Sequence, residues 1–256
     1  MTRGRRGIIL KSAREIELMR TANQHLAEIL EKMCEAAKPG VCTLELDTLA
    51  RAEINKRPVE SAFLGYGGYP AVVCTSVNEV IVHGIPRKDV ILKDGDIIGI
   101  DFGVVYKGYV GDSARTLPVG EVTPGVQALV DTTALALEAA IALCTPDHRL
   151  SDIGRCVESF ANPEGYGVVR DFVGHGIGTR MHEEPQVPNY FDGPKPRLRP
   201  GLVIAIEPMF NLGTHEVRVL EDDWTAVTGD GLWAAHFEHS IAVTENGPDV
   251  VSRLGG

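Results

Sequence analysis

Cysteine is scarce in this sequence, and basic residues are outnumbered by acidic ones. The cysteines are odd in number and include no Cys-x-x-Cys pair, so the sequence predicts neither a disulfide framework nor a zinc-finger site. Lys and Arg total 25 against 35 Asp and Glu, a formal net charge of −10, which argues against a general binder of phosphate backbones. We therefore expect reduced, structural thiols and no direct nucleic-acid specificity.

A long apolar run is also lacking at the start of the chain. The first ten residues, "MTRGRRGIIL", carry the positive charges of a signal peptide, but only a four-residue apolar run precedes Lys11, and we expect no long apolar stretch after it. The sequence therefore predicts a cytoplasmic protein without membrane contact. With 256 residues, of which 44% are hydrophobic, the chain can bury a substantial core, and we expect one domain over 1–256.

The predicted helices and strands occur in the same order twice. Ser12 and Glu15 form a capping box at the start of the first helix, and Pro39 and Gly40 end it. The first series consists of helices at 12–38 and 44–56 and strands at 71–75, 79–83, 96–105 and 109–117. The second series consists of helices near 124–144 and 151–161 and strands near 167–175, 202–207, 216–220 and 238–244. Two similar halves, about 12–120 and 121–250, are indicated.

The predicted hairpin at 96–120 carries an aspartate in each strand. If its turn is centred between residues 106 and 107, Asp101 and Asp112 are directly opposed, roughly 5 Å apart on one face. Two such carboxylates beside apolar residues require a shared proton, an arginine such as Arg115, or a divalent metal. A solvated edge hairpin, or a bulge that separates the carboxylates, is an equally open alternative.

A local repeat adds further acids. The segment "GDIIGID" at 95–101 matches "GLVIAIE" at 201–207, so Asp101 corresponds to Glu207, and the later segment "HFEHSIAV" brings Glu238. His175 and His182 lie in the Gly-rich segment "GHGIGTRMHEEP". Each feature alone has a simpler reading, as a structural histidine or a strand-end acid at the surface. Together they supply four carboxylates and one imidazole, a donor set suited to two first-row divalent ions.

Five segments together resemble the type I methionine aminopeptidases, which are pita-bread fold metallopeptidases. They are "YPAVVCTSVNEVIVHGIP", "DFGVVYKGYVGDSART", "GHGIGTRMHEEP", "AIEP" and "FEHSIAVT", in the order and spacing of that family. The resemblance implies an α+β fold with two pseudo-symmetric αβ halves around a central antiparallel sheet. It also implies a hydrolase that removes the initiator methionine from nascent proteins and peptides by a hydroxide activated by two metals, favouring a small second residue.

The resemblance also implies a role for each ligand. Asp101 corresponds to the bidentate ligand of one metal, His175 and Glu207 to ligands of the other, and Asp112 and Glu238 to bridges between them. Glu207 further resembles the general base of the family. A proline-directed aminopeptidase of the same fold would use the same ligands, and a non-catalytic binding module on this fold typically loses some of them.

The substrate-binding residues follow from the same resemblance. His83 and His182 correspond to residues that contact the substrate and stabilise the tetrahedral intermediate. The residues at positions of the methionine pocket are Phe63, Tyr66, Tyr69, Cys74, Met181 and Trp224. Phe63 and Met181 depart from the residues frequent in bacterial members, which alters the expected pocket width.

The implied cofactors and partners complete the interpretation. The two divalent ions are Fe(II), Mn(II), Co(II) or Zn(II), because oxygen-rich ligation with one histidine accommodates each of them. Asn78 and Val80 resemble carbonyl ligands of a structural monovalent cation. The implied partner is a peptide or nascent chain that begins with Met, with transient ribosome contact. We expect a monomer.

Overall fold

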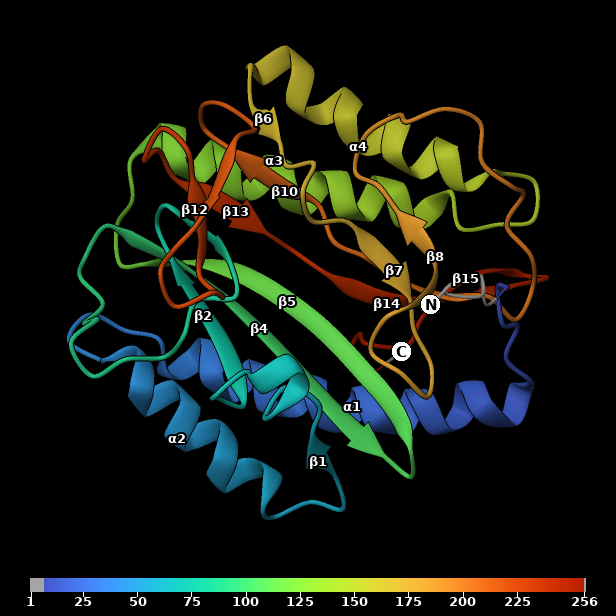
Figure 1. The fold of residues 1–256 in the computed structure, drawn as a ribbon, viewed down its shortest axis with the longest axis horizontal. Coiled ribbons are helices and arrows are strands. Elements are labelled where there is room, and N and C mark those ends of the chain that lie inside the picture. The colour runs from blue at the N-terminus through green and yellow to red at the C-terminus, as the bar shows by residue number, and fades with distance from the viewer. Residues whose placement is uncertain (1–6, 256) are drawn as a thin grey trace.

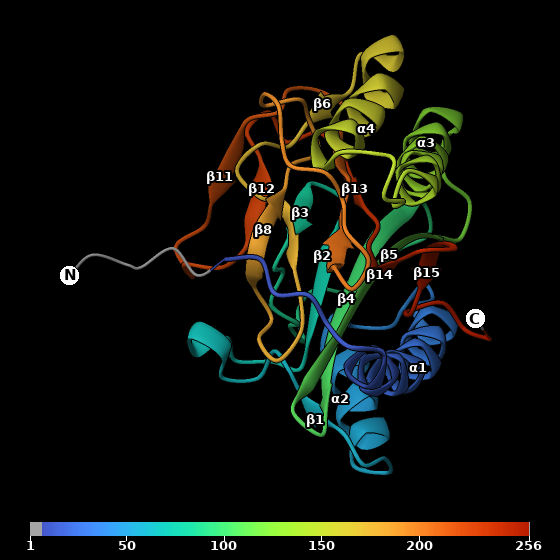
Figure 2. The ribbon, with the colours of Figure 1, turned by 90° about the vertical axis from the view of Figure 1, so that its right-hand side faces the viewer.

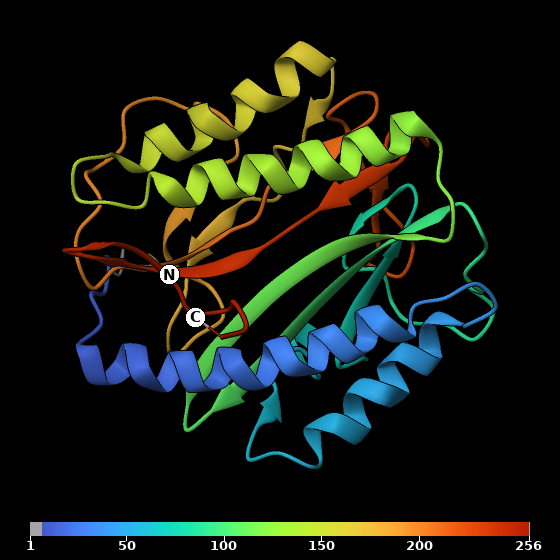
Figure 3. The same cartoon turned by 180° about the vertical axis from the view of Figure 1, so that it is seen from behind.

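The four α-helices lie on one side of the strands. The structure is a computed structural model that describes residues 7–255. The helices lie behind the strands in Figure 1 and in front of them when the molecule is seen from behind in Figure 3. Figure 2 shows the first and second helix pairs one above the other along the same side. The positively charged start, residues 1–6, lies outside the described residues.

The helices begin and end close to their predicted bounds. They are α1 (Ala13–Ala36), α2 (Thr43–Ile54), α3 (Pro124–Ala142) and α4 (Leu150–Glu164), with a short 3-10 helix η1 (Tyr66–Gly68). The predicted capping box is confirmed, since the Ser12 side chain accepts from the Glu15 backbone and the Glu15 carboxylate accepts from the Ser12 backbone. These local signals determine where the helices start.

The helix α3 corrects the expectation that no long apolar stretch follows the start. By length and composition alone, this helix could cross a membrane. In the folded chain, Leu129, Ala136 and Ala140 are fully buried in a core cluster shared with α4 and the strands beneath. The apolar character of α3 is thus accounted for by packing in the protein core.

Two larger sheets and two smaller ones carry the site. The strands of the first half are β1 (Glu60–Ser61), β2 (Val73–Val77), β3 (Val80–Val82), β4 (Asp96–Tyr106) and β5 (Tyr109–Val119). Those of the second half are β6 (Gly167–Val168), β7 (Gly174–Gly176), β8 (Glu183–Val187), β9 (Val203–Ile206), β10 (Met209–Asn211), β11 (Val217–Val219), β12 (Ala226–Thr228), β13 (Ala234–His236), β14 (His239–Thr244) and β15 (Gly247–Val250). The predicted strand at 167–175 was wrong in extent, because β6 and β7 are separate there.

The order of strands brings the two halves together. The sheets are β1-β4-β2 with β5 beside β4, β15-β14-β9-β7-β8, β13-β10-β6, and β11-β12-β3. Ala114 in β5 and Glu238 just before β14 exchange backbone hydrogen bonds of 3.3 and 2.9 Å. This bridge joins the two larger sheets at the place where the predicted acids gather.

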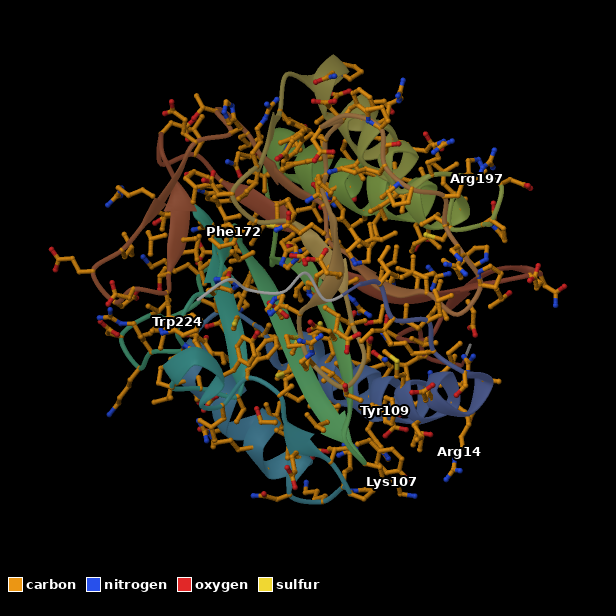
Figure 4. The ribbon with its side chains drawn as sticks, turned by 45° about the vertical axis from the view of Figure 1, so that its right-hand side comes forward. Arg14, Lys107, Tyr109, Phe172, Arg197 and Trp224 are labelled. Carbon is orange, nitrogen blue, oxygen red and sulfur yellow. The ribbon has the colours of Figure 1, made fainter. Side chains whose placement is uncertain are left out.

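The hairpin of β4 and β5 turns one residue later than predicted. Tyr106 pairs with Tyr109, so the turn is centred between Lys107 and Gly108. Both turn residues have positive φ, 48° and 82°, which matches a two-residue turn whose twist suits the flanking strands. Figure 4 labels Lys107 and Tyr109 at this tip, and the Tyr109 hydroxyl donates to Glu15 over 3.0 Å.

This register corrects the predicted pairing of the aspartates. Asp101 is opposite Ala114, and Asp112 is opposite Gly103. The prediction of direct opposition was therefore wrong, because it depended on the centre of the turn. The two aspartates are diagonal neighbours on one face of the sheet, which keeps both carboxylates within reach of a common ligand.

Candidate active site

Every catalytic, substrate-binding and divalent-metal residue predicted from the sequence lines one cavity of about 150 Å³. The acids and His175 lie at one part of it, and the aromatic and sulfur-containing side chains form the rest. The predicted residues in its lining are Phe63, Tyr66, Tyr69, Cys74, His83, Asp101, Asp112, His175, Met181, His182, Glu207, Trp224 and Glu238. Four residues that were not predicted also line it: Val82, Phe172, Val173 and His236.

The tightest group of acids and imidazole comes from three strands. Asp112 lies on β5, His175 on β7, and Glu238 directly before β14. One ligand atom from each lies within 4.8 Å of the others, and all three side chains are buried. The Ser240 hydroxyl donates to the Asp112 carbonyl over 2.8 Å, which holds β14 against β5 at this point. Residues far apart in the sequence thus form one compact donor set.

Glu207 extends this set towards a second histidine. Its Oε1 atom lies 3.6 Å from His175 Nε2, and its Oε2 atom lies 3.9 Å from His236 Nε2. The Asn189 side chain donates to the Glu207 carbonyl over 2.9 Å and fixes the chain after β9. His236 was missed in the sequence, although it stands two positions before Glu238, a spacing that places both on one face of an extended chain.

Several polar atoms in this group are buried and have no hydrogen-bond partner among residues 7–255. They include Asp101 Oδ1, Asp112 Oδ1, Glu238 Oε1 and His236 Nε2. Unpaired buried acceptors are costly, and a buried cluster of them indicates a missing partner. Cations that accept oxygen ligands would satisfy the carboxylate oxygens among these atoms. The donor set therefore fits a divalent metal.

The pKa values of the acids also indicate a missing cation. Burial raises the pKa of Asp101 to about 7 and, together with the Asp101 charge, that of Glu207 to about 8. Burial and the neighbouring carboxylates raise the pKa of Asp112 and of Glu238 well above the usual range. Burial lowers the pKa of His175 to about 3, so this imidazole is neutral and able to act as a ligand. A bound cation would reverse the shifts of the acids.

The rest of the cavity wall is aromatic and sulfur-rich. Tyr69 packs edge-on against Trp224, with ring centroids 5.0 Å apart, and against Phe63 at 6.5 Å. Cys74 stands opposite Asp101 across β2 and β4, and burial, with a contribution from the Asp101 charge, raises the pKa of its thiol well above the usual value. The neutral thiol and the side chain of Met181 make this wall suitable for a thioether.

Two histidines stand between the acids and the aromatic wall. The His182 Nδ1 atom lies 2.6 Å from the Tyr66 hydroxyl, and the His182 ring lies 4.3 Å from that of His175. His83 adopts a positive φ of 61°, an uncommon conformation for this residue type. Phe172 and Trp224, both labelled in Figure 4, pack edge-on against the His83 ring. Burial lowers the pKa of His83 to about 4, so the ring is neutral near pH 7.

The predicted ligands of a monovalent cation lie at the start of β3 and just before it. Asn78 adopts a positive φ of 54°, and its carbonyl accepts a hydrogen bond from the Ala234 backbone over 2.9 Å. Val80 begins β3 and pairs with Val227. The cation itself stays a prediction.

Comparisons with known proteins agree with this geometry. The model of metallopeptidase family M24 matches residues 17–245. The chain is 46% identical over 246 residues to a methionine aminopeptidase from Clostridium acetobutylicum, covering 96% of this chain and 98% of that protein. The crystal structure of a methionine aminopeptidase from Thermotoga maritima superposes with a TM-score of 0.94 at 43% identity, covering 96% of this chain and all of that one.

A more distant structure shares the fold alone. A prolidase from Pyrococcus furiosus superposes with a TM-score of 0.78 at 21% identity, and this chain covers 66% of its length. The pita-bread architecture is common to both groups of enzymes, whereas the high identity is to the first. This chain therefore belongs to metallopeptidase family M24 and, within it, to the methionine aminopeptidases.

Proposed function

We propose that this protein is a methionyl aminopeptidase that removes the initiator methionine from nascent proteins and peptides, favouring a small second residue. The observation that supports this most strongly is a single cavity that joins an aromatic and sulfur-rich wall to a cluster of buried acids without partners. The wall suits an apolar thioether side chain, and the acids suit cations that activate water. Fold alone would not distinguish this substrate from others.

Two divalent ions would be held by the acids and His175. In this assignment Asp101 would help to hold one ion, His175 and Glu207 would help to hold the other, and Asp112 and Glu238 would contribute to holding both. Such ions polarise a peptide carbonyl and lower the pKa of water, which is the chemistry that the side chains cannot supply themselves. Fe(II), Mn(II), Co(II) and Zn(II) all suit this donor set.

The side chains around the ions would move and hold protons. Glu207 is the general base in this proposal, since its Oε1 and Oε2 atoms lie between two buried imidazoles and its side chain lines the cavity that would hold the substrate. It would accept a proton from the attacking water and deliver it to the leaving amine. Burial lowers the pKa of His182, so this ring is neutral. When the Tyr66 hydroxyl donates to its Nδ1 atom, the ring proton resides on Nε2 and can be donated to a developing oxyanion.

His83 is the second substrate contact in this proposal. Its ring is held between Phe172 and Trp224, at centroid distances of 5.2 and 6.1 Å, and it lines the same cavity as the acids. A ring packed in this way keeps its orientation when substrate enters, which reduces the cost of aligning the reacting groups. The first side chain of the substrate would lie against Phe63, Tyr66, Tyr69, Cys74, Met181 and Trp224.

We further infer the setting in which this activity operates. The chain would act as one catalytic domain over 1–256, with pseudo-repeat halves of about 12–120 and 121–250. It would be a cytoplasmic monomer that meets its substrates at the ribosome by transient contact, and it would hold a monovalent cation near Asn78 and Val80.

A peptide panel tests the proposed reaction. The metal-supplied protein should release methionine from Met-Ala-Ser, release little from Met-Leu-Ser, and leave Xaa-Pro peptides intact, with free amino acids measured by chromatography. Preferential cleavage of Xaa-Pro peptides would instead indicate a proline-directed enzyme of this fold. Tight binding of Met-Ala-Ser without any release of methionine would indicate a binding module.

A further inference from the structure

Gly103 lies on the face of β4 that carries the site and has no side chain there. The alternation of side chains along a strand places position 103 on the same face as Asp101, and Asp112 lies directly opposite it on β5. On the other edge, the Ala62 backbone donates to the Gly103 carbonyl over 3.0 Å, so the segment that leads to Phe63 runs alongside. A side chain at position 103 would therefore project beside the two carboxylates.

The Phe63 ring occupies the space that such a side chain would need. A Cβ atom added to Gly103 would lie 2.6 Å from Phe63 Cε1, 3.0 Å from Phe63 Cδ1 and 3.1 Å from the Cβ atom of Ala62. Favourable contacts between carbon atoms need about 3.5 to 4.0 Å. Gly103 does not have a positive φ, so its backbone is compatible with any residue. Space for the Phe63 ring is thus the physical reason for glycine here.

Phe63 packs against side chains that are themselves held in place. Its ring packs edge-on against Tyr69, whose side chain is buried and whose hydroxyl donates to the carbonyls of Val73 and Gly84, each over 3.1 Å. Phe63 also packs against the cluster that contains Met181. A ring displaced from Gly103 would therefore move into the cavity and narrow it.

We propose that Gly103 and Phe63 form a matched pair that sets the space available in the pocket for the first side chain of the substrate. Gly103 acts as a positioning residue, because it seats the ring that contacts the substrate. This inference rests on the proposed aminopeptidase function and deepens it. It limits the first residue to side chains no longer than that of methionine, and it excludes ethionine, whose unbranched thioether is one methylene longer.

A double-mutant cycle tests the pair. The proteins are the parent, Gly103→Ala, Phe63→Ala and Phe63→Ala/Gly103→Ala, with Gly99→Ala as the matched control. Gly99 lies on the same strand and face, but a Cβ atom there would meet Thr116 Oγ1 at 3.4 Å, an ordinary contact. Thermal unfolding and the KM for Met-Ala-Ser are measured for each protein, and ethionyl-Ala-Ser is the second substrate.

The expected results depend on whether Phe63 is present. Gly103→Ala should lower the Tm by at least about 4 °C in the parent, because overpacking strains the site, and by less than half as much in Phe63→Ala. It should raise the KM for Met-Ala-Ser at least about tenfold in the parent and less than about threefold in Phe63→Ala, where only Ala62 must yield. In Phe63→Ala alone, the ratio of kcat/KM for ethionyl-Ala-Ser to kcat/KM for Met-Ala-Ser should be at least about fivefold higher than in the parent. Gly99→Ala should match the parent.

Two results would overturn the inference. One is an effect of Gly103→Ala on Tm and KM that is the same with and without Phe63. The other is an unchanged preference for Met-Ala-Ser over ethionyl-Ala-Ser in Phe63→Ala. Failure of the proposed function would look different, since the parent would then release no methionine while the unfolding cycle still reported whether Gly103 and Phe63 are coupled.

Discussion

Replacing Lys11 by methionine should destabilise the protein strongly. The Lys11 ammonium lies 2.6 Å from Glu183 Oε2, and the two side chains are only 3% and 2% exposed. Methionine retains most of the length of the side chain but removes its charge, which leaves the Glu183 carboxylate buried without its cation. Losing one partner of a buried ion pair costs about 3 to 5 kcal/mol. For a chain of this size each kcal/mol lowers the Tm by about 2 to 4 °C, so the expected fall is about 6 to 20 °C.

The same substitution should also slow the reaction. The other oxygen of Glu183 accepts from the backbones of Thr179 and Arg180, at 3.1 and 3.3 Å. The ion pair therefore holds the turn that carries Met181 and His182. We expect kcat for Met-Ala-Ser to fall in Lys11→Met while bound metal stays at the parental level.

Differential scanning calorimetry of three variants tests this reasoning. Lys11→Met/Glu183→Gln removes both charges and should recover at least half of the lost Tm. The control is Arg87→Met, which breaks the exposed pair with Asp89 and should change the Tm little, because solvent screens such a pair. If Lys11→Met unfolds within 2 °C of Arg87→Met, roughly the effect of 1 kcal/mol, the Lys11 pair has no special role.

Three further predictions concern the acids and His182. Asp112→Asn and Glu238→Gln should each abolish activity and reduce bound metal, measured by mass spectrometry, because each removes a bridging charge. Near-normal turnover and metal content in either variant would contradict the assignment of a two-metal site. His182→Ala should lower kcat about a hundredfold to a thousandfold through loss of a donor to the oxyanion, with metal retained. Metal loss in proportion to activity would make His182 a ligand instead. The chelator-treated protein should lose stability as the pH rises from about 6.5 to about 8.5. Folding raises the pKa of Asp101 to about 7 and that of Glu207 to about 8. The stability that comes from a raised carboxyl pKa is lost as the pH rises through these values. The buried histidines, whose lowered pKa values affect stability below about pH 6.5, do not contribute in this window, so a Tm that rises with pH there would contradict the assignment.

The helices could be predicted from local residues, whereas the exact pairing of strands could not. The capping box of Ser12 and Glu15 and the stop at Pro39 and Gly40 are local signals, and the helix they predict is α1. The short strands β10, β12 and β13 depend on partners far along the chain, such as β3 for β12, and no local pattern indicates them.

The predicted pairing of the two aspartates depended on the exact position of the hairpin turn. A three-residue interval from Tyr106 to Gly108 allows two turn centres, and the choice depends on both Lys107 and Gly108 adopting positive φ. Moving the turn centre by one residue moves each pairing partner by two residues, so Asp101 pairs with Ala114 rather than with Asp112. The aspartates still share a face, because that depends only on an even offset along each strand.

Most of the residues that line the candidate site could be predicted from the sequence, but the side chains that pack around them could not. The family segments indicated the acids, the histidines and the pocket, and all of these line one cavity. His236 and Phe172 were missed because their roles come from packing across the fold, His236 beside Glu207 and Phe172 against His83. The seat of Phe63 on Gly103 likewise depends on the register of β1 against β4.

Hydrolysis of Met-Ala-Ser by the metal-free protein, titrated with Mn(II) or Co(II), tests the central claim most directly. Methionine release and calorimetric binding are followed in the same titration. We predict no release without metal, activity restored by the divalent ion, and two ions bound per chain at saturation. Undiminished hydrolysis by the metal-free protein would contradict the assignment of the buried acids as a metal centre. So would a titration in which no divalent ion binds saturably.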